Sequence, residues 1–170
     1  MGVMLEIITG DLLNSDCKFI VHQTNCLTDT IASGLAYYLF QKYPYADCYK
    51  DRTCPAIPGT INVRGNGQDQ KYIINLHGQY YPGGVLKYFE NHELDGIKAR
   101  EKYFHKGLLA IAKIQNLESV AFNYLIGCGI AGGNWDHYYK MIDNFTKYVE
   151  KTFGTKVYIV QREKDKQNGS

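Results

Sequence analysis

A glycine-rich segment between a predicted strand and a predicted helix is the strongest constraint on how this chain folds. It reads IGCGIAGGNW over residues 126–135, and Gly127, Gly129 and Gly132 satisfy the weak pattern GxGxxG. Glycine permits positive φ angles and a close approach of backbone to ligand. Free N–H groups in such a loop, and at the start of the next helix, bind phosphate oxygens. The segment predicts either a phosphate-binding loop of an α/β domain or a turn needed only for tight packing.

A dinucleotide site of the Rossmann type is the obvious alternative for this pattern. Its fingerprint lies in the first strand-to-helix turn, with an acidic residue about 20 positions later at the end of the next strand. Here the glycine segment lies in the last third of the chain, and the next predicted strand ends at Val160 and Gln161. The sequence therefore favours another kind of phosphate site.

Short apolar runs alternate with amphipathic stretches along the chain. We expect strands at 4–9, 19–22, 60–63, 71–76, 119–122 and 156–160, with an antiparallel pair around the Gly65-Asn66-Gly67 turn. We expect helices from Gly34 to Pro44, along the stripe that runs from Ile97 through Arg100 to Ile111, and from the N-cap Asn134 to Gly154. Because strand and helix alternate, the sheet should be largely parallel and covered on both faces.

Length and composition fit one globular domain. The chain has 170 residues, and we assign 1–160 to the domain and 161–170, which is polar and aperiodic, to a tail. No apolar stretch approaches the roughly 20 residues of a membrane span, so we expect no membrane contact. The N-terminal residues lack the features of a signal peptide, which predicts a cytoplasmic or otherwise intracellular protein. A monomer would suffice for such a fold.

Neither a metal nor nucleic-acid binding by charge alone is predicted. The five cysteines include no CxxC pair, which argues against disulfides and structural zinc. Four residues are possible metal ligands by residue type: His22, Cys26, Cys48 and Cys54. We do not predict a metal there, nor any cofactor. The net charge of +2 is small and its basic residues are dispersed. An anionic ligand would therefore have to be attracted by local geometry.

A second segment also passes from a strand into a helix through small residues. It reads VHQTNCLTDTIASGLA over residues 21–36. Asn25 offers hydrogen-bond donors and acceptors to a sugar hydroxyl, and His22 can exchange a proton near neutral pH, unless it is simply a buried core histidine. Asp11, after the first strand, could accept a hydrogen bond from an adenine amino group or could cap a helix.

These motifs together resemble the ordered series of macro domains, from about Leu5 to Val160. The matching pieces are GDL at 10–12, HQTNC at 22–26, SGLA at 33–36, YIINL at 72–76 and IGCGIAGGNW. The resemblance implies a three-layer α/β/α fold with a mostly parallel mixed sheet that binds ADP-ribose across the strand ends. It places Asp11 at the adenine, Asn25 and the Ser33-Gly34 loop at the distal ribose, and residues 127–133 around the pyrophosphate. The implied ligand-binding residues are Asp11, Leu12, Asn25, Ser33, Gly34, Leu35, Ala36, Gln79, Ile126, Gly127, Cys128, Gly129, Ile130, Ala131, Gly132 and Gly133.

Within macro domains, the chain looks like the group that includes terminal ADP-ribose glycohydrolases and ADP-ribose-1″-phosphate phosphatases. The glycohydrolase branch uses a lysine and an aspartate at positions that match Gln79 and Ala131 here, which puts that activity in doubt. The phosphatase branch has a histidine three residues before the asparagine, as His22 and Asn25 stand here. We therefore predict a hydrolase that processes ADP-ribose-1″-phosphate, with His22 and Asn25 as catalytic residues. The alternatives are a non-catalytic reader of ADP-ribose or ADP-ribosylated macromolecules, and a hydrolase that removes ADP-ribosyl or O-acetyl groups.

Overall fold

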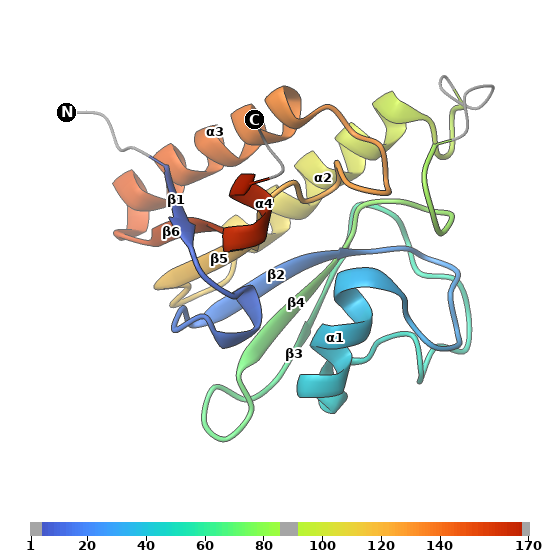
Figure 1. Ribbon diagram of the computed structural model, residues 1–170, viewed down its shortest axis with the longest axis horizontal. Coiled ribbons are helices and arrows are strands. Elements are labelled where there is room, and N and C mark those ends of the chain that lie inside the picture. Colours follow the sequence, from blue (N-terminus) through green and yellow to red (C-terminus); the bar gives the residue numbers. More distant parts are fainter. Residues whose placement is uncertain (1–4, 86–91, 168–170) are drawn as a thin grey trace.

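The computed structural model describes residues 5–85 and 92–167 (Figure 1). Within these residues the chain forms a six-stranded sheet in the order β1-β6-β5-β2-β4-β3. Every neighbouring pair is parallel except β3 and β4, which are antiparallel as predicted. The strands are β1 (Glu6–Thr9), β2 (Phe19–Thr24), β3 (Ile61–Arg64), β4 (Tyr72–His77), β5 (Ser119–Asn123) and β6 (Lys156–Gln161).

Helices cover both faces of the sheet, which confirms the three-layer α/β/α prediction. Figure 1 shows α1 on one face, and α2 and α3 side by side on the other. The helices are α1 (Gly34–Lys42), α2 (Ile97–Ala112), α3 (Trp135–Phe153) and α4 (Glu163–Gln167), with 3-10 turns η1 (Leu12–Asn14) and η2 (Pro44–Ala46). No helix in the described ranges is both long enough and apolar enough to cross a lipid bilayer.

Two apolar cores lie on the two faces of the sheet. On the α1 face, Leu39 and Phe40 pack with Ile20 and Ile73. On the other face, Phe104 of α2 belongs to the same core as residues of α3, β2 and β5. Alternate residues of a strand point to opposite faces, so a buried parallel strand supplies both cores.

The boundaries of α3 follow from its capping residues. Asn134 is the N-cap and its side chain accepts a hydrogen bond from the His137 N–H, while Gly154 ends the helix with a φ of 72°. This left-handed conformation is one that glycine adopts at little cost. Both caps were predicted from the sequence and both are confirmed.

Residues 161–167 are more ordered than the polar composition led us to expect. β6 continues to Gln161, which is paired in register with Thr9 of β1. A short helix, α4, follows, and the Arg162 guanidinium donates to the Asp165 carboxylate at 3.0 Å. Pairing with the neighbouring strand explains why the chain stays folded where apolar periodicity ends.

Candidate functional site

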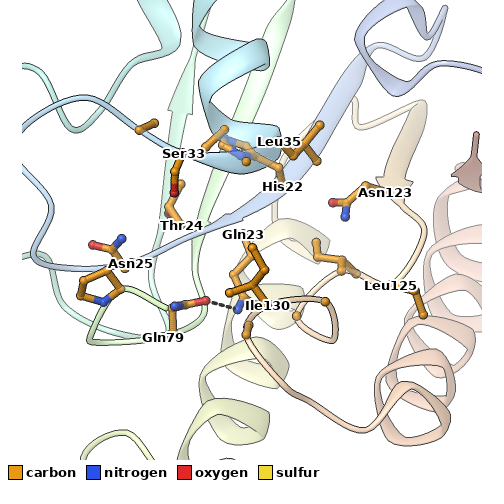
Figure 2. Close-up of a pocket in the computed structure, with 18 of the residues that line it drawn as sticks. His22, Gln23, Thr24, Asn25, Ser33, Leu35, Gln79, Asn123, Leu125 and Ile130 are labelled. Atoms are coloured by element: carbon orange, nitrogen blue, oxygen red, sulfur yellow. Dashed lines mark hydrogen bonds between the residues drawn. The ribbon is translucent and has the colours of Figure 1, made fainter. Parts of the chain in front are cut away.

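A cavity of about 470 Å³ opens at the carboxyl ends of β2 and β5, the two central parallel strands. The chain leaves β2 toward α1 on one face and leaves β5 toward α3 on the other. Such a switch point is where open α/β sheets bind ligands, and the volume suits a small molecule. Figure 2 shows side chains from both connections around this cavity. The predicted residues that line it are His22, Asn25, Ser33, Gly34, Leu35, Ala36, Gln79, Ile126, Gly127, Gly129, Ile130 and Ala131.

One wall of the cavity is the N-terminus of α1. Ser33 is the N-cap residue, but its side chain makes no capping hydrogen bond. Gly34 begins the helix with a φ of 62°, a conformation that favours glycine. The N–H groups of the first turn therefore have no partner within the helix, and they carry the positive end of its dipole. This end of α1 can attract an anion.

The opposite wall is the glycine loop, whose glycines have two different roles. A Cβ at Gly127 would lie 2.4 Å from the Tyr138 ring, and one at Gly133 would lie 2.5 Å from the Gly127 carbonyl oxygen. These two glycines are required for packing. At Gly129 a Cβ would meet nothing within 4 Å. The two interpretations of the segment, tight packing and ligand approach, thus apply to different positions.

Three consecutive amides at the tip of this loop are free. The loop is closed by hydrogen bonds from Gly132 N to Gly129 O and from Gly133 N to Gly127 O. In the part of the chain that the structure describes, the N–H groups of Gly129, Ile130 and Ala131 have no hydrogen-bond partner. All three residues line the cavity. They form a second set of unpaired donors, on residues that line the same cavity as the N-terminus of α1.

His22 lies in the wall of the cavity but is almost completely buried. It is 1% exposed, and its Nε2 lies 2.5 Å from Asn75 Oδ1, so Nε2–H donates and Nδ1 is the unprotonated nitrogen. Nδ1 is buried without a hydrogen-bond partner among the described residues. Burial lowers the pKa of His22 to about 4, although the hydrogen bond to Asn75 acts in the opposite direction. At neutral pH the ring is uncharged and can only accept a proton.

Asn25 lies at the cavity with its side-chain amide fully hydrogen-bonded. Its Oδ1 accepts from the N–H groups of Leu27 and Thr28, and its Nδ2 donates to Thr28 Oγ1 and Tyr49 Oη. An amide has two donors and room for two acceptors, so all positions are used. Asn25 shapes the turn after β2 rather than presenting a free amide to a ligand.

Gln79 belongs to a hydrogen-bonded wall next to Asn25. Its Oε1 accepts from Gln23 Nε2 at 2.8 Å, drawn in Figure 2, and its Nε2 donates to the carbonyl groups of Tyr81 and Gly83. The side chain is 8% exposed and carries no charge. It holds the segment after β4 against the end of β2.

Some predicted residues are not brought to this cavity, and others that line it were not predicted. The Asp11 carboxylate accepts from Leu13 N and Asn14 Nδ2, and so caps η1 beside a separate cavity. Leu12, Cys128, Gly132 and Gly133, all of them described, also lie outside the lining. The lining residues that were not among the predicted ligand-binding residues are Gln23, Thr24, Thr28, Ile31, Ala32, Tyr49, Pro82, Gly83, Asn123, Tyr124, Leu125, Arg162 and Asp165.

Solved macro domains share this architecture over nearly the whole chain. The macrodomain of Mycobacterium tuberculosis DarG matches with a TM-score of 0.67 and 21% identity, over 94% of this chain and 98% of that one. The macrodomain of Thermus aquaticus DarG matches with a TM-score of 0.68 and 23% identity, over 92% and 97%. The Trypanosoma brucei macrodomain in complex with ADP-ribose matches with a TM-score of 0.58 and 14% identity, over 96% and 65%.

The chain therefore has the macro domain fold, an α/β fold whose six-stranded mixed sheet is flanked by helices. No protein-family model matches the sequence, and no curated protein does.

Proposed function

We propose that the cavity binds ADP-ribose or a close derivative of it, free or attached to a macromolecule. The observation that carries this proposal is the convergence of two sets of unpaired amides, in the first turn of α1 and at residues 129–131, on one cavity. Two phosphates joined by an oxygen fit between two such sets. The Trypanosoma brucei macrodomain, which shares the fold, is described in complex with ADP-ribose.

A charge placed at Gly129 tests this proposal. A side chain is sterically tolerated there, because nothing lies within 4 Å of its Cβ. Gly129→Glu puts a carboxylate beside the free amides, whereas Gly129→Gln adds the same bulk without charge. Titration calorimetry should show ADP-ribose binding by the wild type, a weaker affinity for G129Q and at least a further tenfold loss for G129E. Absence of binding by the wild type, or equal affinities of the two variants, would refute the proposed pocket.

We further propose hydrolysis of ADP-ribose-1″-phosphate as the reaction, because His22 lines the cavity and its buried Nδ1 has no hydrogen-bond partner among the described residues. Water attacks the phosphorus, the 1″ oxygen of the ribose leaves, and the products are ADP-ribose and inorganic phosphate. His22 accepts a proton from the water through Nδ1, the proton is then passed to the leaving 1″ oxygen, and the free loop amides stabilise the phosphoryl oxygens. Asn25 contributes by holding the turn after β2.

Release of inorganic phosphate decides between this hydrolase and a reader. His22→Gln removes Nδ1 but keeps a side-chain amide that can reach Asn75 in place of Nε2, so the fold should tolerate it better than a truncation. The wild type should release phosphate, and H22Q should bind ADP-ribose but release phosphate at least a hundredfold more slowly. Binding without phosphate release by the wild type would leave a reader, or a hydrolase acting on ADP-ribosyl or O-acetyl groups.

A further inference from the structure

Asn123, in the wall of the cavity, has an unused hydrogen-bond acceptor. It is the last residue of β5 and one of the residues that line the cavity. Its Oδ1 is buried and has no hydrogen-bond partner among the described residues. Its Nδ2 lies 3.4 Å from the Tyr124 carbonyl oxygen, an interaction that favours keeping the amide nitrogen there and Oδ1 free. A buried acceptor without a partner is costly, and a ligand that donates to it would remove that cost.

The surroundings of Asn123 differ from the two phosphate-binding walls. Figure 2 shows its side chain between Leu35, in the first turn of α1, and Leu125, at the start of the glycine loop. Leu125 is held in the left-handed region with a φ of 63°. Both leucines line the cavity and are apolar, whereas the free amides lie at the tip of the loop.

The same part of the cavity extends along the neighbouring strand. Asn123 is paired with Val160 of β6, and Arg162 and Asp165, just beyond that strand, line the cavity. The cavity therefore continues past the amides on the side away from Asn25. A ligand with its phosphates at the amides must send one of its two ends into this region.

The Asn123 acceptor and the apolar side chains near it limit which chemical group of the ligand can bind in this region. A phosphate or carboxylate oxygen would be repelled by Oδ1, and the hydroxyl groups of a ribose would lose hydration against Leu35 and Leu125. A flat heterocycle buries its faces against apolar side chains and offers N–H groups at its edge. Asparagine is a residue that proteins use to read adenine, through its exocyclic amino group and a ring nitrogen.

We propose that Asn123 determines base specificity by accepting a hydrogen bond from the exocyclic amino group of a 6-aminopurine. This inference rests on the proposed function, since it assumes that the phosphates lie at the free amides. It adds a specificity-determining residue on β5, whereas the Asp11 carboxylate caps η1 outside the lining of this cavity.

The test compares ADP-ribose with the analogue in which the base is purine without the 6-amino group. Affinities of both are measured by calorimetry for the wild type, Asn123→Leu and Asn123→Asp. The wild type should bind ADP-ribose up to about tenfold more tightly than the analogue, the size of one net hydrogen bond. N123L, which has a similar shape but no acceptor, should bind the two equally. N123D keeps an acceptor oxygen and should retain the preference, even if its charge weakens both affinities.

The outcomes separate this inference from the proposed function. If the wild type binds both nucleotides equally, or if N123L keeps the preference, the role of Asn123 is refuted and ADP-ribose binding stands. If the wild type binds neither nucleotide, both proposals are refuted. If N123L melts far below the wild type, Asn123→Ala removes the same oxygen without added bulk, and the ratio of its two affinities decides in the same way.

Discussion

His22 and His77 are both buried with one ring nitrogen in a short hydrogen bond. His22 bonds Asn75, and His77 Nδ1 lies 2.6 Å from the Thr24 hydroxyl. Burial lowers the pKa of each ring to about 4, and for His77 the positive charges of Arg52 and Arg64 add to the effect. Both rings are therefore neutral in the folded protein at pH values where an exposed histidine begins to protonate.

Protonation of these two histidines should make stability depend on pH. Because the unfolded chain binds the protons more readily, with a pKa near 6.5, stability is full above that value and falls as pH drops toward 4. Between pH 8 and pH 5 the loss should be on the order of 2 kcal/mol for each ring. Urea unfolding across this pH range should show that the His22→Asn variant loses about half as much stability as the wild type. His105→Asn, at an exposed position, should leave it unchanged; a flat profile in the wild type would contradict the buried neutral rings.

The N-terminus of α1 shows how a helix end can be kept available for a ligand. Ser33 has the extended backbone of an N-cap residue, with a φ of -124° and a ψ of 167°, yet makes no capping bond. Serine, asparagine and aspartate normally cap helices well. The donors that a cap would satisfy are left without that partner, at the position of the proposed phosphate site.

Restoring the cap should raise stability and weaken binding. Ser33→Asn and Ser33→Asp should each stabilise the free protein by about 0.5–1 kcal/mol in urea unfolding, through a side-chain bond to the first-turn amides. Both should weaken ADP-ribose binding by competing for those amides. S33D should lose at least tenfold more affinity than S33N, because its charge also repels the phosphates. Unchanged affinity in both variants would place the phosphates elsewhere.

A buried ion pair ties α2 to the segments that form the cavity wall. Arg100 Nη2 lies 2.6 Å from Asp95 Oδ2, and the two side chains are 3% and 6% exposed. Arg100 also donates to the carbonyl groups of Gly83 and Ala131, while Asp95 accepts from the N–H groups of Tyr80 and Tyr81. Arg100 thus connects the segment after β4 to the glycine loop.

Removal of the arginine should be more damaging than neutralisation of both partners. Arg100→Met leaves Asp95 charged and buried, which should cost about 3–5 kcal/mol. Asp95→Asn in the same chain removes that charge and keeps an acceptor for Tyr80, so the double variant should recover part of the loss. Urea unfolding of the two single variants and the double variant gives the coupling energy. Strictly additive losses would show that the pair is not coupled.

The sequence predicts an element well when the residues that determine it lie within that element, and poorly when they lie far apart in the chain. The helix from Asn134 to Gly154 is set by its own caps and stripe, and its bounds were predicted well. The strand order is set by pairs far apart in the chain, such as Thr9 with Gln161, and no local pattern encodes it. The stripe that contains Arg100 did not identify its buried partner, Asp95, which precedes the helix.

The candidate site was predictable where glycines and small residues mark a loop. Asn123 carries the same kind of signal as His22, a polar side chain at the end of an apolar run, and could have been found by it. Arg162 gave no such signal, because it lies at the start of a segment with no apolar periodicity. Its place at the cavity follows only from the pairing of β6 with β5.

At the scale of the whole molecule, the cavity joins the two helical layers. The β2–α1 connection belongs to one face and the β5–α3 connection to the other, with the sheet between the two helical layers (Figure 1). A ligand that contacts both connections should therefore raise the free energy of unfolding of the whole domain. A fragment that contacts only one connection should raise it less.

Thermal unfolding with whole and divided ligands tests this bridging. ADP-ribose at 100 times its Kd should add about 2.7 kcal/mol to the free energy of unfolding. For a domain of this size that corresponds to a rise in Tm of roughly 5–10 °C. AMP and ribose 5-phosphate, added together and each at the concentration used for ADP-ribose, should raise Tm by less. Neither fragment contacts both walls, and each loses its own translational and rotational freedom on binding. The matched control is G129E, whose Tm should rise less than that of the wild type at the same ADP-ribose concentration. If the two fragments together stabilise the wild type as much as the intact molecule does, each wall binds independently and the cavity is two sites rather than one.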